Sequence, residues 1–242
     1  SYLNTIDPAG SSLLKSDTGH WRAIDQSIAM CEYAESRWKG VNQGYGMIQV
    51  LLGECWHERN RPDKAEACLL NGRRIGLDLG DTGLILPATV ALAQLKSDHG
   101  EIETAQILLQ ETAQLAVVES GENERAVIEA CRARLDMKAG QSAAVRRWLR
   151  GLPAGTEGVL EMRRMYEYLT MLRAFLFLQQ TRKGVRFGEK LLLFSESWYL
   201  HCHIAEISLL LAILYDRRGE RSAAFRKLEK ALDIGQIGRA HV

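Results

Sequence analysis

The sequence has little of what builds a β-sheet or a disulfide framework. Only four prolines occur in 242 residues, and Val and Thr are sparse beside Leu, Ala, Glu and Arg. That mix favours helix over strand. The five cysteines are odd in number and include no CxxC pair, which argues against disulfides. Each stands in an apolar helical context, so we expect small core side chains in a reducing cytoplasm.

Other absences exclude whole classes of function. No apolar run approaches the ~18 residues of a membrane span, and no signal peptide is visible. We therefore expect a cytoplasmic chain with no membrane contact. No phosphate loop, HExxH, GxSxG or Ser-His-Asp order is present, so we expect no enzymatic activity and no cofactor. The near-neutral net charge of +1, from 31 basic and 30 acidic residues, predicts no electrostatic footprint for nucleic acid or an anionic membrane.

A metal site is the one chemical alternative that the residues suggest. His201, Cys202 and His203 are consecutive. Consecutive residues on a helix point about 100° apart, so the three side chains cannot all ligate one ion well. No second cluster of ligands lies nearby in the sequence, and we expect no metal.

An internal repeat is the main signal that is present. Turn residues recur at intervals of 40, 40, 39 and 40 positions, and three of the five are glycine. Gly and Asn end helices by adopting the left-handed conformation. These positions are Asn60, Gly100, Gly140, Gln179 and Gly219.

Three further columns follow the same register. Seven residues before the turn position stand Gly53, Ala93, Ala133, Leu172 and Ala212. Five after it stand Ala65, Ala105, Val145, Gly184 and Ala224, and nine after it stand Leu69, Leu109, Leu149, Gly188 and Leu228. Small residues in the first two columns let the helices of a hairpin approach closely, and the apolar third column fills the space toward the next repeat.

The repeat predicts an all-α, TPR-like right-handed superhelix of antiparallel helix pairs. We expect first helices at about 44–59, 82–98, 123–138, 161–178 and 202–217. We expect second helices near 62–78, 101–118, 141–151, 184–197 and 220–235. A helix at 20–38 belongs to a partial repeat over residues 1–43, and five repeats occupy residues 44–236 of one domain, residues 1–236. Residues 237–242 (IGRAHV) match one reading frame of a sequencing adapter, which predicts a non-native tail.

Two phrases resemble the helical-repeat region of LuxR-type regulators of the MalT-like class. In LLGECWHERNRPDKAEACLLNGRRIGLDLGD (51–81), the match is carried by Gly53, Glu54, Glu58, Arg59, Asn60 and Ala65. RGERSAAFRKLEKALDIGQ (218–236) resembles the last repeat of that region. The resemblance implies a bacterial transcription activator with an ATP-binding domain upstream and a DNA-binding domain downstream. ATP and DNA would then bind only to those missing domains.

One polar column is the candidate binding site. Six residues before the turn position stand Glu54, Gln94, Arg134 and Arg173, with Ile213 in the fifth repeat. In TPR-type hairpins this position faces the concave groove, where convergent polar groups hold a small effector or a partner protein. The alternative is a ladder of polar contacts between neighbouring helices. A generic TPR scaffold that binds a peptide is the alternative to effector sensing, and self-association is a further expected property.

Overall fold

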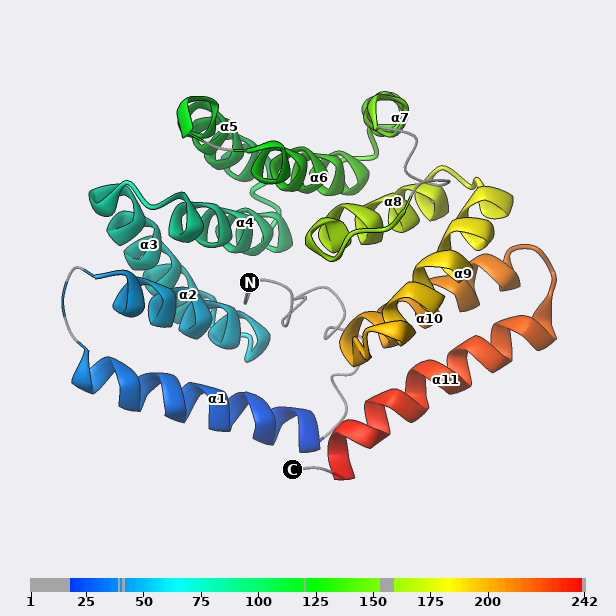
Figure 1. Ribbon diagram of the computed structural model, residues 1–242, viewed down its shortest axis with the longest axis horizontal. Coiled ribbons are helices and arrows are strands. Elements are labelled where there is room, and N and C mark those ends of the chain that lie inside the picture. The colour runs from blue at the N-terminus through cyan, green and yellow to red at the C-terminus, as the bar shows by residue number, and fades with distance from the viewer. Residues whose placement is uncertain (1–17, 39, 41, 120, 153–158, 241–242) are drawn as a thin grey trace. The chain divides into compact units, whose positions relative to one another are not determined.

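The computed structural model describes residues 18–38, 40, 42–119, 121–152 and 159–240. These residues form eleven α-helices, one 3-10 turn and no strand (Figure 1). The all-α prediction is therefore confirmed. None of the described helices has the length and hydropathy needed to span a bilayer.

The helices alternate as the 40-residue period predicts. After α1 (Thr18–Arg37), the first helices are α2 (Gln43–Glu58), α4 (Thr82–Asp98), α6 (Glu122–Lys138), α8 (Met165–Phe177) and α10 (His201–Asp216). The second helices are α3 (Pro62–Leu79), α5 (Ile102–Glu119), α7 (Ser142–Gly151), α9 (Thr181–Ser197) and α11 (Arg221–Ala240). Three boundaries differ from the prediction by more than two residues: α8 begins at Met165, after the 3-10 turn Met162–Arg164, α9 begins at Thr181, and α11 ends at Ala240. Because α11 runs on to Ala240, its last turn includes part of the predicted tail.

The five predicted turn residues all adopt positive φ. The angles are 55° at Asn60, 83° at Gly100, 73° at Gly140, 57° at Gln179 and 78° at Gly219. In each turn, the amide of the next residue donates to the carbonyl five residues earlier in the chain. Glu220 N to Tyr215 O, at 3.0 Å, is an example. This bond is the 6→1 bond of a Schellman motif, which satisfies a carbonyl at the end of the first helix.

Contacts divide the chain into two compact units, residues 15–135 and residues 136–242. In the first unit, the small residues of the repeat place the two helices of a hairpin in direct contact. A methyl group at Gly53 of α2 would lie 2.6 Å from Leu69 Cδ2 and 3.1 Å from the Ala65 carbonyl oxygen of α3. Leu69 lies against Gly53, is fully buried, and packs with Val50 and Leu92 in a core that α4 completes.

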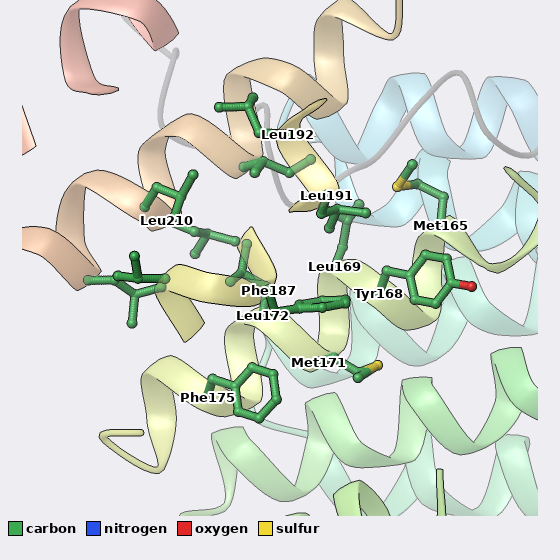
Figure 2. Packing of buried hydrophobic residues seen from close by; sticks show 14 of the residues in the cluster. Met165, Tyr168, Leu169, Met171, Leu172, Phe175, Phe187, Leu191, Leu192 and Leu210 are labelled. Atoms are coloured by element: carbon green, nitrogen blue, oxygen red, sulfur yellow. The ribbon is translucent and has the colours of Figure 1, made fainter. Parts of the chain in front are cut away.

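The second unit has a larger, partly aromatic core (Figure 2). Phe187 of α9 makes edge contacts with Tyr168 and Phe175 of α8, with ring centroids 6.1 and 6.0 Å apart. Leu172 and Leu211 are fully buried beside them. Edge-to-face geometry of this kind is favourable beyond the apolar area that it buries. The core fixes α8, α9 and α10 as one packed group.

Candidate ligand-binding column

The predicted polar column lies on consecutive first helices. Glu54, Gln94 and Arg134 stand on α2, α4 and α6 in the first unit, and Arg173 stands on α8 in the second. All four side chains are partly buried. Helices α2 and α4 contact each other directly. The column is therefore neither a core column nor a fully solvated one.

Glu54 has an unusual ionisation. Burial, together with the neighbouring carboxylate of Glu58, raises the pKa of Glu54 from 4.5 to about 7. Glu58 lies one turn further along α2 and is only 9% exposed. A carboxyl with this pKa can donate or accept a hydrogen bond near neutral pH. The i, i+4 spacing of two acidic residues is a sequence signal for this pair, of which only Glu54 was predicted as a site residue.

The two arginines of the column have different surroundings. The terminal nitrogens Nη1 and Nη2 of Arg134 are buried. Arg173 forms an ion pair with Glu206 of α10, with Nη2 2.6 Å and Nε 3.1 Å from Oε1. Glu206 is 4% exposed. At Arg173 the column thus links two first helices, which is the geometry that the ladder interpretation describes for this position.

Other polar contacts between helices of the first unit lie beside the column. His57 Nε2 of α2 lies 3.1 Å from Asp98 Oδ2 of α4, and Lys96 Nζ of α4 lies 2.8 Å from Glu66 Oε1 of α3. These two residue pairs stand near the hairpin turns. They were not predicted, because no column of the repeat contains both partners.

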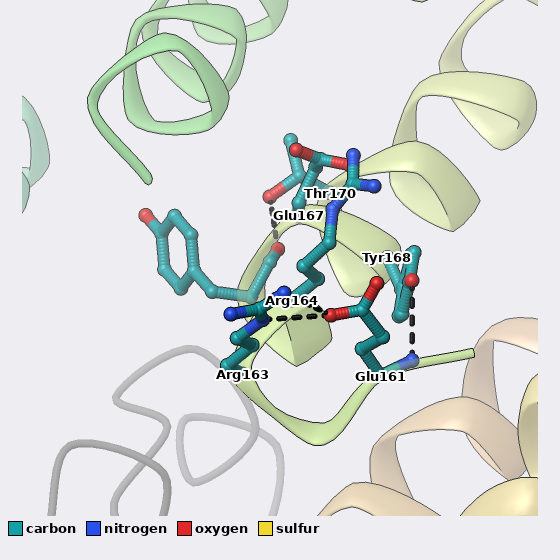
Figure 3. A network of polar contacts seen from close by, with 7 residues as sticks. Glu161, Arg163, Arg164, Glu167, Tyr168 and Thr170 are labelled. Carbon is teal, nitrogen blue, oxygen red and sulfur yellow. Dashed lines mark hydrogen bonds and ion pairs between the residues drawn. The ribbon is translucent and has the colours of Figure 1, made fainter. Parts of the chain in front are cut away.

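The start of α8 carries a separate polar network (Figure 3). Arg163 donates to Glu161 at 2.7 Å, Arg164 pairs with Glu167, and the Tyr168 hydroxyl accepts from the Glu161 amide at 3.3 Å. Burial raises the pKa of Glu167, and the Arg164 guanidinium opposes that effect. No side chain caps the helix at its N-cap residue, Arg164. The network therefore holds residues 161–164 against the first turn of α8, which is a structural role.

A small pocket lies away from the column, between α4, α5 and α6. Its empty space is about 250 Å³ and is partly open to solvent. Its lining is mostly apolar, with two threonines and one carboxylate: Thr82, Ile85, Leu86, Thr112, Leu115, Glu124 and Ile128. Oε2 of Glu124 is buried there without a hydrogen-bond partner among the described residues. Because that space includes open solvent, the enclosed part has room for about one water molecule and not for a ligand.

The His201–Cys202–His203 sequence forms the start of α10. His203 is buried and 5% exposed, whereas His201 and Cys202 are exposed. The helix therefore directs the three side chains to different sides, as its geometry requires. Among the described residues, no group of three or more potential ligands could hold a metal ion.

Comparisons with known proteins agree with this architecture. A family model described as the MalT-like TPR region matches residues 23–240. The crystal structure of a kinesin light chain from Podosopora anserina, described as having nearly identical TPR-like repeats, aligns with this chain with a TM-score of 0.52 and 20% identity. That alignment covers 77% of this chain and 92% of the other. BtubC (BKLC) from P. vanneervenii aligns with a TM-score of 0.54 and 13% identity over 92% of each chain. No curated protein matches the sequence.

At these identities the two structures show the fold alone, which is TPR-like. The family match extends over most of the chain and includes both phrases, 51–81 and 218–236, that carry the sequence resemblance. It confirms the predicted MalT-like repeat region and supports a helical-repeat region that mediates protein interaction. The chain belongs to the family of MalT-like TPR regions.

Proposed function

We propose that this chain is the effector-sensing and self-association region of a bacterial LuxR/MalT-type transcription activator. The observation that carries the proposal is the column of Glu54, Gln94 and Arg134, three partly buried polar side chains on successive first helices of the family's repeat. The residues on either side of each in the chain are small or apolar: Gly53 and Cys55, Ala93 and Leu95, and Ala133 and Leu135. A rigid wall with a few convergent polar groups is the arrangement that orients a small ligand.

The chemistry of the column limits the effector. Arg134 carries a guanidinium with buried terminal nitrogens, Gln94 carries both a donor and an acceptor, and Glu54 can donate or accept near neutral pH. A ligand rich in hydroxyl groups, such as a sugar, can both donate and accept hydrogen bonds and so matches this mixture of donors and acceptors. Binding would shift the array toward the arrangement that contacts the ligand better, and this differential affinity is what a sensing region requires.

Calorimetry tests the site. Titrations would use glucose and its short oligomers, with short neutral and acidic peptides as the second class of probe. We expect a sugar to bind, with a Kd at least tenfold weaker after Arg134→Gln or Glu54→Gln, which by the affinity relation is about 1.4 kcal/mol. Arg125→Gln and Glu103→Gln, at exposed positions of the same unit, are the matched controls and should change the Kd less than about twofold.

Two results would favour other functions. Binding of peptides and not of sugars would identify a peptide-binding TPR scaffold. Equal losses in the column variants and the controls would place the ligand elsewhere. The regulator context has its own test, the gene sequence on either side of this chain: we expect a phosphate loop upstream and a helix-turn-helix domain downstream, and a gene with neither contradicts that part of the proposal.

A further inference from the structure

The net charge of +1 is the sum of two unlike halves. Residues 136–242 contain 18 Lys and Arg against 11 Asp and Glu, a net charge of +7, whereas residues 1–135 contain 13 against 19, a net charge of −6. The division coincides with the boundary between the two compact units. A charge excess in one unit creates a local field that the average of the whole chain hides.

The acidic residues of the second unit are largely occupied by neighbours inside it. Glu189 pairs with Lys227, Glu196 with Lys230, and Glu220 with Arg218. Glu161, Glu167 and Glu206 pair with arginines around and along α8. These pairs leave a group of basic side chains that form no ion pair with any described residue, which includes Arg146, Arg147, Arg150, Arg182 and Lys183.

These five side chains stand on two second helices and are exposed, as is Arg186, which has an interaction of its own. Arg146, Arg147 and Arg150 belong to α7, and Arg182, Lys183 and Arg186 to the first half of α9. We call these six residues the arginine face. The opposite sides of the two helices, with Leu149 of α7 and Phe187 of α9 among them, pack on one apolar core. The arginine face is thus the solvent side of a single packed unit.

The arrangement is locally unfavourable in two ways. Arg146 and Arg150 are like charges at i, i+4, which repel. Arg182 and Lys183 also stand in the first turn of α9, which has no acidic residue, where the helix dipole disfavours a cation. An anionic partner would remove both penalties.

We propose that the arginine face binds the phosphodiester backbone of a nucleic acid. Among the described residues, the exposed positions of α7 and of the first two turns of α9 hold no large apolar side chain. A protein partner would need aromatic or apolar anchors at the centre of its interface, whereas backbone contacts need only basic groups. Five of the six side chains are arginine, which presents a bidentate fork to phosphate. Because the exposed positions of α7 and of the first two turns of α9 also hold no aromatic side chain that could stack on bases, we expect contacts to the backbone and no sequence specificity.

Fluorescence anisotropy with a labelled DNA duplex of about 20 base pairs tests the proposal on the full chain. For four to six phosphates, the expected Kd rises by about 10² to 10³ between 50 and 200 mM salt. Reversal of α9 (Arg182→Glu, Lys183→Glu, Arg186→Glu) or of α7 (Arg146→Glu, Arg147→Glu, Arg150→Glu) should weaken binding at least tenfold at 50 mM salt.

The matched control removes three exposed arginines of the other unit, Arg61→Glu, Arg74→Glu and Arg125→Glu. It has the same net charge as each test variant, and we expect it to change the Kd less than about threefold. Circular dichroism verifies that every variant is folded. The same titration with an RNA duplex and a single-stranded DNA of equal length identifies which nucleic acid binds best, because all three carry a phosphodiester backbone.

Three results would overturn the proposal. One is the absence of binding at 50 mM salt, and another is equal weakening by the control. The third is stronger competition by polyglutamate or phosphatidylserine vesicles than by unlabelled duplex, which would assign the face to an acidic protein or to a membrane. None of these results bears on the sugar titrations, because the arginine face and the column share no residue.

Discussion

The Arg173 guanidinium lies 2.6 Å from the Glu206 carboxylate and joins the first helices α8 and α10. Glu206 is 4% exposed, so the removal of its partner would leave a buried charge. We expect Arg173→Met to lower the free energy of unfolding by about 3 kcal/mol, measured by urea denaturation. Arg173→Met combined with Glu206→Leu should recover most of that loss. A loss below ~1 kcal/mol would show that the pair is solvated.

The matched control for this pair is Arg163→Met. Arg163 pairs with Glu161 in the same unit, but the two side chains are 65% and 43% exposed. Exposed pairs of this kind contribute under about 1 kcal/mol. A control loss as large as that of Arg173→Met would mean that burial of Glu206 is not the cause.

The raised pKa of Glu54 makes stability depend on pH in a defined direction. The folded chain holds this proton up to about pH 7, whereas the unfolded chain releases it near 4.5. The contribution to stability is therefore complete below pH 4.5 and is lost as pH rises to about 7. Glu54→Gln should flatten this segment of the pH profile and be more stable than the wild type at pH 8, by roughly 2 kcal/mol. Denaturant titrations from pH 4.5 to 8 measure this change in the free energy of unfolding. Glu103→Gln, at an exposed position, is the control and should keep the pH profile of the wild type.

Gly53 tests the close approach of α2 and α3. Alanine favours helix by ~1 kcal/mol over glycine, but at Gly53 its methyl group would clash with Leu69 and approach the Ala65 carbonyl oxygen at 3.1 Å. We expect Gly53→Ala to lower the midpoint of unfolding, with a net loss of about 1–2 kcal/mol. Gly151→Ala, at the end of α7 with no atom within 4 Å of the added methyl, should be neutral or stabilising. If both substitutions stabilise, the hairpin is more loosely packed than described.

Gln179 and Tyr199 adopt left-handed φ angles of 57° and 54° without the benefit of glycine. This conformation costs about 1 kcal/mol for an L residue. Gln179→Gly should therefore raise the thermal midpoint, with a gain of up to ~1 kcal/mol. Gly140→Ala, at φ 73° with open space around it, should lower the midpoint by a similar amount. A fall in the midpoint of Gln179→Gly would contradict the assigned turn geometry.

Much of the fold could be predicted because the repeat is a local property. A glycine or asparagine column fixes the left-handed turns, and periodicity alone identified Gln179, a residue that does not favour that conformation. The end of α9 at Ser197 was predicted, but the left-handed φ of Tyr199 was not, because its residue type does not favour that conformation. The 3-10 turn before α8 was also missed, because it depends on the network around Glu161 and Tyr168.

The candidate site was less predictable, since it depends on pairs between helices. The position of Arg173 follows from the register, but Glu206 is 33 residues away and belongs to no repeat column. The arginine face was hidden for another reason. Acidic and basic residues balance over the whole chain, and only a division at residue 135 reveals the excess in each half.

Hydrogen–deuterium exchange, with and without a saturating sugar that binds in calorimetry, tests the central claim most directly. The claim is that the column of Glu54, Gln94 and Arg134 holds the effector. We predict slower exchange in α2, α4 and α6 around these residues, and loss of that protection in Arg134→Gln. Protection confined to the second helices α3 and α5, or unchanged exchange at saturation, would contradict it.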